Sequence, residues 1–352
     1  MAKIGQLVMN KGLWQGQRLI SESWIEDMTS LHSITPDICG DYNYGYHIWV
    51  GRKSNTYLFN GMFGQNVLGF WDNGIVIVSN AGNDEVFQSS SYYRIAEELF
   101  GGRFEDALPE NKVALSALRK TEKDCSFTRT QRRERRFLSF FHKKDAFSQA
   151  KSFLNGTVLA PKEPCPSVGF MPATLQVTQN NFTKGISRIA FSYNGDGLLM
   201  TFVEGDSEYS VPVGFEKAEV CDILFDGEPF RVSVLGRFAT DEEDNYVLTV
   251  NVAFVETPFS RKIKMRFLVS SGYKKVNIEI KEQPGEAYLV QFAEKYLETL
   301  DNVPLLSNVI AKADMGFLKF MVSRVMEPVV EAVKVESLPL SAESNENTQG
   351  EE

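Results

Sequence analysis

The chain has few of the residues that cross-link a protein or bind metals. Its 352 residues include three histidines and four cysteines. The cysteines are widely scattered, at Cys39, Cys125, Cys165 and Cys221. Without an export signal, such cysteines are more often free thiols than a disulfide framework. No paired Cys/His spacing and no dinucleotide or phosphate-loop pattern is present, so we expect no metal site and no cofactor.

The chain also lacks an excess of positive charge and any long apolar run. Lys and Arg number 37 against 46 Asp and Glu, which gives a net charge of −9 and a pI near 5.2. This balance argues against a general nucleic-acid binder, because neutralising phosphates needs a positive face. No segment reaches the roughly 18 apolar residues that span a bilayer. The first residues lack the order of a signal peptide, so a cytoplasmic location is expected from this start site.

Residues 1–104 combine helical and strand patterns. The first helix is predicted to place Met1, Ile4, Leu7 and Val8 on one face. Ser21 is the predicted cap of a second helix, with Ile20 and Ile25 as a hydrophobic staple. Aromatic-rich strands are predicted from Tyr42 to Val50 and from Tyr57 to Asn60, and a helix from Tyr92 to Phe100.

The segment from Tyr57 to Trp71 is the most informative part of this region. Two apolar runs flank a Gly-x-x-Gly-Gln turn at 61–65, and a third run follows from Ile75 to Ser79. This pattern predicts an antiparallel meander. Glycines within a strand pattern mark bulges or a close approach to the backbone. An ordinary hairpin and one wall of an active site both fit the pattern.

The rest of the chain changes character three times. Residues 105–150 are predicted to be a basic linker, partly helical; its run 129–136 would bind an anionic partner or form a solvated helix face. Residues 151–283 alternate like the strands of a sandwich or barrel and predict a β-rich accessory domain. Residues 284–336 are predicted to be helical, and residues 337–352 to be a disordered acidic tail.

Four segments occur in an order that resembles a known family. They are Met1–Asn10, Leu19–Glu26, Tyr44–Trp49 and Gly61–Gln65. Together they resemble the C-terminal part of the catalytic domain in serine hydrolases of the class C β-lactamase and penicillin-binding-protein-like family. Residues 150–335 are similar to the accessory C-terminal region of some bacterial members. The fold class implied is α+β, a partial β-lactamase-like antiparallel sheet with flanking helices, then a β-rich domain and a helical end.

The resemblance implies hydrolysis of an ester, amide or peptide through a serine acyl-enzyme. The family's chemistry needs a Ser-x-x-Lys turn, in which the neutral amine takes the hydroxyl proton. It also needs a Tyr- or Ser-x-Asn element, and an edge strand carrying Lys-Thr-Gly or a relative of it, whose backbone helps bind the acyl oxygen. In family order, the first two elements lie upstream of the segment that opens this chain.

Only the third element has a counterpart, Gly61, Met62, Phe63 and Gly64 before Gln65. These five residues are the predicted substrate-binding or oxyanion wall. Met62 stands where family members often carry Lys or His, so only backbone donors and pocket shape remain. We therefore expect no catalytic residue in this chain.

Other matches to the family's elements fall in the wrong order. Ser148–Lys151 and Ser271–Lys274 both fit Ser-x-x-Lys, but both follow the third element, and about one or two chance matches are expected. Ser192–Asn194 fits the second element but leads into a turn. His32 and His47 offer an imidazole base, but no Gly-x-Ser-x-Gly elbow exists to pair with it. His47, in an aromatic strand, is expected to pack.

Two functions remain open. The first is a truncated serine hydrolase, inactive alone, whose partner is a separately encoded N-terminal half of the catalytic domain. Without that half, the Tyr44–Ser79 meander is expected to expose apolar surface and a free edge. The second is a non-catalytic binding protein, in which the β-rich residues 151–283 bind a small apolar ligand or a partner.

Overall fold

The computed structural model describes residues 1–36, 41–84, 91–102, 109–125, 146–194, 197–215, 217–225, 227–288 and 323–335. The predicted basic run 129–136 and acidic tail 337–352 lie outside these residues, as does most of the segment predicted to be helical. The chain divides into two compact units. The first comprises Met1–Phe141, Thr257–Ser260 and Glu282–Ser323, and the second His142–Glu256, Arg261–Lys281 and Arg324–Glu352.

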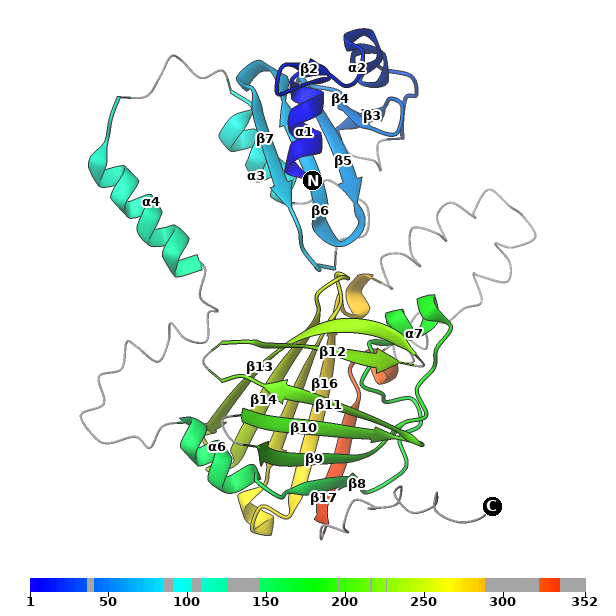
Figure 1. Ribbon diagram of the computed structural model, residues 1–352, viewed down its shortest axis with the longest axis vertical. Helices are drawn as coiled ribbons and strands as arrows, with labels where there is room; N and C mark the ends of the chain where they lie inside the picture. Colours follow the sequence, from blue (N-terminus) through cyan, green and yellow to red (C-terminus); the bar gives the residue numbers. More distant parts are fainter. Residues whose placement is uncertain are drawn as a thin grey trace, which may run out of the picture. The chain divides into compact units, whose positions relative to one another are not determined.

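The first unit is built on a five-stranded antiparallel sheet in the order β3-β4-β5-β6-β7 (Figure 1). The predicted meander is confirmed. The single strand predicted from Tyr42 to Val50 is instead two strands joined by a bend. The strands are β3 (Tyr42–Tyr44), β4 (Trp49–Gly51), β5 (Thr56–Gly61), β6 (Gln65–Phe70) and β7 (Ile75–Ser79).

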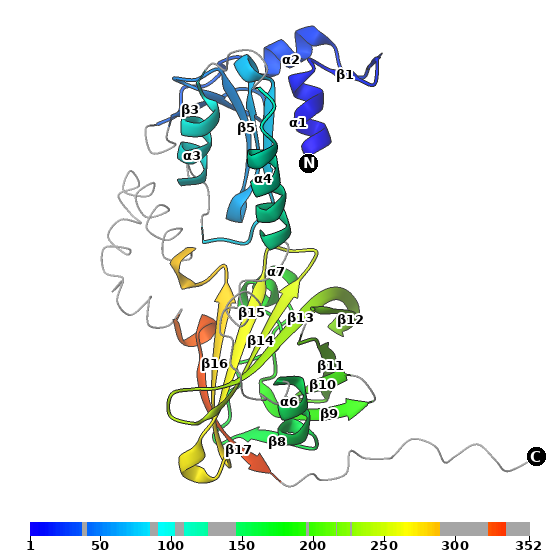
Figure 2. The same ribbon diagram turned by 90° about the vertical axis from the view of Figure 1, so that its left-hand side faces the viewer.

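Helices cover both faces of this sheet. Figure 2 shows α1 (Ala2–Met9) and α3 (Ser91–Phe100) on opposite sides of it. Val8 of α1 and Ile25 of α2 (Glu22–Met28) share a buried cluster with Tyr57 of β5 and with Ile48, which precedes β4. On the other face, α3 contributes its aromatic and alanine positions to a second cluster, formed by Tyr42, Leu58, Leu68, Phe70, Tyr93 and Ala96. The strand period of two sends neighbouring residues to these two cores.

The first helix packs on the sheet through a glycine. A Cβ on Gly5 would lie 2.6 Å from the Cγ1 atoms of Val67 and Val76. The Tyr57 hydroxyl donates a hydrogen bond of 2.6 Å to the Gly5 carbonyl. The buried residues of α1 are therefore Gly5 and Val8, while Ile4 is 58% exposed. The prediction that Ile4 lies on the buried face of α1 is wrong. The helix backbone approaches the sheet closely at Gly5, and this approach, not the spacing of apolar side chains, determines which residues of α1 are buried.

The predicted cap of the second helix is confirmed. The Trp24 N–H donates to the Ser21 hydroxyl oxygen at 3.2 Å, and Ser21 has extended backbone angles.

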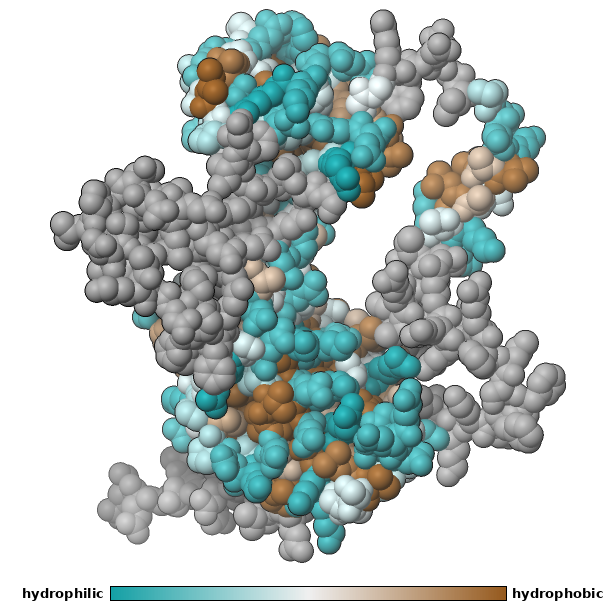
Figure 3. Space-filling model, turned by 180° about the vertical axis from the view of Figure 1, so that it is seen from behind, coloured by the Kyte–Doolittle hydropathy of each residue, from teal (hydrophilic) through white to brown (hydrophobic). Residues whose placement is uncertain are grey.

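The remaining described elements of this unit are β1 (Leu13–Trp14), β2 (Gln17–Arg18), η2 (Met62–Gly64), η3 (Trp71–Asn73) and α4 (Lys112–Cys125). Seen from behind, α4 shows apolar surface (Figure 3), and its Val113, Leu115 and Leu118 side chains are exposed.

The second unit is a nearly closed barrel. Its ten strands follow the order β11-β10-β9-β8-β17-β16-β15-β14-β13-β12. The last strand in the sequence, β17, pairs antiparallel with both β16 and β8. The strands are β8 (Val158–Pro161), β9 (Ile186–Asn194), β10 (Gly197–Glu204), β11 (Ser207–Val213), β12 (Glu219–Phe225), β13 (Glu228–Thr240), β14 (Tyr246–Phe254), β15 (Ser260–Phe267), β16 (Lys275–Gln283) and β17 (Val329–Val335).

Side chains fill the barrel. Burial alternates along β13, where Phe230, Val232, Val234 and Phe238 are buried, and the same alternation continues along β14. Alternating burial is the signature of a sheet with one dry face. The β-rich character predicted for residues 151–283 is confirmed, although the sheet also includes β17 from outside that range. Helices α6 (Ala146–Leu154) and α7 (Ala173–Gln179) and the short η4 (Val269–Ser271) complete the described part of the unit.

The prediction of a helical segment at residues 284–336 is wrong at its end, where Val329–Val335 forms strand β17. The described residues 286–288 and 323–326 of this segment are helical. This strand lies between β16 and β8, where it pairs with residues far away in the sequence. The fold is thus a mixture of helix and sheet in which strands dominate. No helix within the described ranges is both long and apolar enough to cross a bilayer.

Candidate functional site

The predicted substrate wall is the turn between β5 and β6. Gly61 ends β5, the 3-10 turn η2 holds Met62 to Gly64, and Gln65 opens β6. In the sheet of the described residues, β5 lies between β4 and β6. The expectation of an edge strand is therefore wrong, because β3 and β4 extend the sheet beyond β5 through local hairpin pairing.

Hydrogen bonds fix the shape of this turn. The Met62 carbonyl accepts from Gln65 Nε2 at 3.3 Å and the Gly64 carbonyl from Ser79 Oγ at 2.8 Å. The Phe63 carbonyl accepts from the Asn83 N–H at 3.2 Å. Phe63 and Gly64 both have positive φ, of 63° and 83°, an uncommon conformation for phenylalanine. These contacts make the turn a rigid feature.

The aromatic side chain of the turn is part of the core. Phe63 is only 6% exposed. Its ring makes edge contacts with Phe259 at a centroid distance of 5.6 Å and with Tyr288 at 5.1 Å, and all three residues belong to the first unit. Gly64 is also buried, whereas Gly61, Met62 and Gln65 are half-buried. Only these three are left to meet a substrate.

The serine candidates all belong to the second unit, whereas the turn belongs to the first. Ser148 is exposed on α6, and the Lys151 ammonium lies 5.6 Å from the ring centre of Tyr193. The Ser271 hydroxyl donates to the Leu268 carbonyl at 2.8 Å and accepts from the Lys275 N–H at 2.9 Å. It therefore stabilises the turn between β15 and β16.

The third serine candidate, Ser192, and the two candidate histidines, His32 and His47, also lie in the structure without a catalytic arrangement around them in the described residues. Ser192 is exposed on β9, where Asn194 pairs with Gly197 across the hairpin. His32 stacks on Tyr46 at 3.8 Å, and its Nε2 lies 2.8 Å from the Asp27 carbonyl. His47 lies in the exposed bend between β3 and β4 with φ of 56°. The prediction that His47 packs within a strand is wrong, because the bend directs the chain back before β4.

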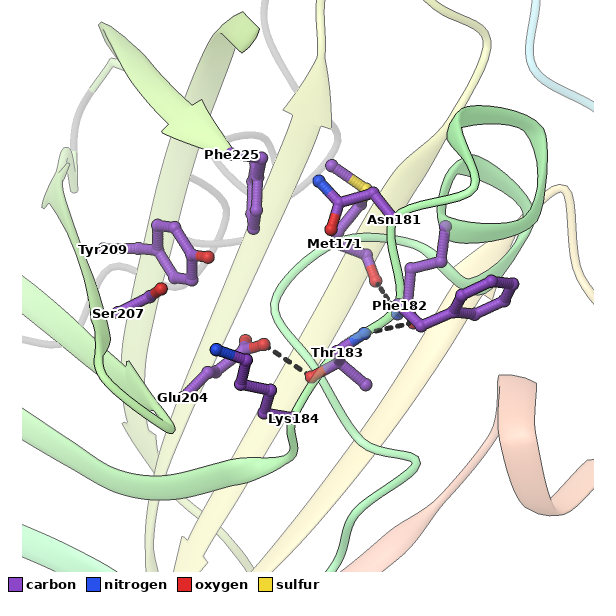
Figure 4. A pocket seen from close by; sticks show the side chains of 10 residues that line it. Met171, Asn181, Phe182, Thr183, Lys184, Glu204, Ser207, Tyr209 and Phe225 are labelled. Carbon is purple, nitrogen blue, oxygen red and sulfur yellow. Dashed lines mark hydrogen bonds between the residues drawn. The ribbon is translucent and has the colours of Figure 1, made fainter. Parts of the chain in front are cut away.

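A second place of interest lies in the barrel unit, where the ladder is open. Strands β11 and β12 end the sheet order. Among the described residues, a parallel bridge from Gly214, just after β11, to Leu235 of β13 connects the two sides. A small hollow with a cavity volume of about 30 Å³, open to solvent, lies beside this seam (Figure 4). Its lining residues come from the α7 region and three strands: Met171, Gln176, Asn181, Phe182, Thr183, Lys184, Glu204, Ser207, Tyr209 and Phe225.

A buried carboxylate holds the floor of the hollow together. Glu204 of β10 is 3% exposed. One of its oxygens accepts from the Phe170 N–H, and the other accepts from the Thr183 hydroxyl at 2.5 Å. Burial raises the pKa of the Glu204 carboxyl above its ordinary value, while Thr183, the Phe170 N–H and the charge of Arg261 act in the opposite direction.

The same clamp extends to the segment that precedes α7. The fully buried Arg261 donates to the Gly169 carbonyl. A Cβ on Gly169 would lie 2.5 Å from Thr183 Cβ and 3.1 Å from Glu204 Oε2. Gln176 accepts from the Thr183 N–H at 3.0 Å and donates to the Met171 carbonyl at 2.7 Å. The segment 169–183 is thus fastened to β10 and β15 by polar contacts.

Phe170 fills the barrel beneath this clamp. Its ring is 1% exposed and lies 4.6 Å from Phe202, 6.1 Å from Phe225 and 6.2 Å from Phe254. Across the seam, the rings of Tyr209 and Phe225 are 4.3 Å apart. Aromatic side chains therefore replace the missing ladder as the contact between β11 and β12.

The sequence analysis did not identify Glu204 or Arg261 as site residues, although the strand pattern around each contains a signal that could have found it. Glu204 follows Leu198, Met200 and Phe202 at inward positions of β10, and Arg261 shares the inward positions of β15. Charged residues at buried positions of an alternating strand are unusual unless they are paired. The partner of Glu204, Phe170, lies 34 residues away in the sequence, and the partner of Arg261, Gly169, lies 92 residues away.

Within the described ranges, no group of three or more His, Cys, Asp or Glu side chains could hold a metal ion. Cys165 and Cys221 are free and half-buried, and burial raises the pKa of both thiols. Comparison with known proteins gives no assignment: no protein-family model matches the chain, and no curated protein does.

Proposed function

We propose that residues 1–104 are the substrate-side, C-terminal part of a catalytic domain of the β-lactamase-related serine hydrolase family. The observation that carries the proposal is the order of elements in the first unit. Two helices, an antiparallel meander and a final helix follow one another, with Gly61–Gln65 at the β5–β6 turn. The reaction of the complete domain would be acyl transfer to water through a serine acyl-enzyme.

This chain is proposed not to hydrolyse substrates by itself. Residues 1–141 contain no Ser-x-x-Lys sequence. The two such sequences elsewhere start at an exposed helix serine, Ser148, and at a turn-forming serine, Ser271. Met62 and Gln65 could contact a bound substrate, but neither is a nucleophile. The catalytic serine and lysine would come from another polypeptide segment.

The surface of residues 1–46, which include α1 and α2, is the proposed docking face for that segment. Large apolar side chains in this range are exposed although helices cover both faces of the sheet: Ile4, Leu19, Trp24, Leu31, Ile34 and Tyr46. Trp24 is 50% exposed and stacks on Tyr46 at 5.8 Å. Clustered exposed apolar residues are typical of interaction surfaces. A separately encoded N-terminal half of the domain is the partner that this proposal requires.

The test is a graft. Residues 1–104 would replace the equivalent C-terminal segment of a class C β-lactamase that keeps its own Ser-x-x-Lys. We expect the chimera to fold and to hydrolyse a p-nitrophenyl ester, while the native chain alone shows no turnover. Met62→Lys in the chimera should raise kcat/KM for a carboxylate-bearing chromogenic β-lactam by about tenfold, because a charged hydrogen-bond donor is restored.

Controls make the result decisive. Gln65→Ala would test whether the turn contacts substrate, and Gln6→Ala on the exposed side of α1 is the matched control. A chimera that folds without hydrolysing either substrate would contradict the assignment. Turnover by the native chain that disappears in Ser148→Ala or Ser271→Ala would show instead that the nucleophile lies in the second unit.

A further inference from the structure

Helix α4 has a cap of its own but buries none of its described side chains. The Asn111 Oδ1 atom accepts a hydrogen bond from the Ala114 N–H at 2.9 Å, which caps the first turn. Every side chain from Lys112 to Lys123 is exposed. An isolated helix of this length is marginal in water, and most helices in proteins are stabilised by burial of one apolar face. We therefore expect another surface to cover α4.

One side of α4 is apolar. Its large apolar side chains, Val113, Leu115 and Leu118, are all exposed, and Figure 3 shows apolar surface on this helix. At helical spacing, Ala114 and Ala117 fall within the same broad arc. A helix with such an arc normally buries it against a partner surface.

The other side of α4 is basic. Arg119 and Lys120 lie at the two borders of the apolar side at helical spacing. Lys112 and Lys123 lie between them on the far side. The helix sequence holds four basic residues against two acidic ones. The surface that covers α4 should therefore combine an apolar layer with negative charge.

This positive charge contrasts with the rest of the chain. Residues 112–144 contain eleven basic and three acidic residues, which gives a net positive charge of eight. The whole chain has a net charge of −9. An anionic surface would therefore attract the part of the chain around α4 and repel the remainder, so that α4 is the part held against it.

A lipid surface suits this helix better than a groove in a folded protein. Helices that dock in protein grooves insert large anchor side chains, often aromatic, into matching pockets, and α4 contains no aromatic residue. A bilayer surface needs no matching pocket, because apolar side chains enter the acyl boundary while Lys and Arg attract anionic headgroups. A nucleic acid would pair with the basic residues but would leave the apolar side uncovered.

We propose that α4 binds the surface of an anionic phospholipid bilayer. Val113, Leu115 and Leu118 would enter the boundary between headgroups and acyl chains. Arg119 and Lys120, at the borders of the apolar side, would keep their charges at the level of the lipid phosphates. The helix would lie along the surface, because it is too short and too charged to cross the bilayer.

The test is co-sedimentation of the full-length chain with vesicles of phosphatidylcholine alone or of phosphatidylcholine mixed with phosphatidylglycerol. We expect binding to be at least about tenfold stronger for the anionic vesicles and to weaken as salt is added. The double substitution Leu115→Gln and Leu118→Gln should lower this binding by at least about tenfold, because two apolar side chains no longer leave water. Glutamine is a good helix former and both positions are exposed, so the variant should keep the native melting temperature.

Helix α3 provides the matched control. Its Ile95 and Leu99 are 49% and 60% exposed, close to the 47% and 54% of Leu115 and Leu118. Unlike α4, α3 contains two glutamates and a single arginine. The double substitution Ile95→Gln and Leu99→Gln removes a similar exposed apolar pair and should leave vesicle binding unchanged.

Several results would overturn the proposal. Binding to neither kind of vesicle, or equal binding to both, would exclude an anionic lipid surface. Unchanged binding in the α4 variant, or an equal loss in the α3 variant, would show that the apolar side of α4 is not the contact. Self-association without vesicles that the α4 variant abolishes would assign this side to a second copy of the chain. None of these results bears on the hydrolase assignment, which concerns residues 1–104.

Discussion

Glu204 shows how a single buried acid couples the barrel to pH. Its folded-state pKa is raised above the ordinary value of 4.5, because burial disfavours the charged form more than its partners favour it. As pH falls through the folded-state pKa, the native protein takes up a proton before the unfolded chain does. This residue therefore adds stability as the pH falls towards 4.5, and the added stability is lost as the pH rises.

The substitution Glu204→Gln tests this coupling. Gln keeps an acceptor for the Phe170 N–H and a group that can contact Thr183, but it does not titrate. Urea unfolding of both proteins between pH 7 and pH 4.5 should show the native protein gaining stability relative to Glu204→Gln as the pH falls. Glu208→Gln, an exposed neighbour on the next strand, is the control. A difference that is constant or shrinks on acidification would contradict the prediction.

At the scale of elements, strand β17 has the largest structural consequence. Ala332 is 2% exposed and pairs with Val276 of β16 and Pro161 of β8. A proline in a central strand removes a ladder donor and is normally confined to edges or first positions. Ala332→Pro should therefore lower barrel stability and raise hydrogen exchange in β8 and β16. Val329→Pro, at the exposed start of the strand, should have a much smaller effect.

Local patterns predicted the elements whose partners are near in sequence. Three features could be predicted because turns, caps and period-two burial are local properties of the sequence. They are the meander from Thr56 to Ser79, the cap at Ser21 and the alternating burial of β13. Strand β17 was merged with the preceding helical pattern, because its pairing with β8 spans most of the second unit. The chain carries no local mark of such pairing.

For the candidate sites too, local features were predictable from the sequence and tertiary contacts were not. The position of Gly61–Gln65 at a strand turn was predictable from its glycines, but the burial of Phe63 was not, since Phe259 and Tyr288 are distant in sequence. The hollow could not be predicted because residues from 171 to 225 meet there only after the sheet has rolled up. Tertiary contacts, rather than propensity, determine both features.

At the scale of the whole molecule, acidity is the simplest property to test. The net charge of −9 and the pI near 5.2 mean that mutual repulsion between molecules vanishes close to pH 5. Turbidity of the purified chain, scanned from pH 4 to 8, should therefore peak near that pH and fall on either side. A peak that remains at pH 7 to 8 would indicate association through the exposed apolar face around α1 and α2 rather than through loss of charge.

The strands of the barrel are not held together equally strongly all the way round, because β11 and β12 meet at a seam without ladder pairing among the described residues. Around the rest of the wall, separating two strands means breaking a row of backbone hydrogen bonds. At the seam, the main obstacles are the Tyr209–Phe225 contact and the short link at Gly214. Aromatic rings can change rotamer much faster than a ladder can unzip. The barrel wall is therefore weakest at this seam, where β11 and β12 can separate and widen the interior without unfolding of the sheet.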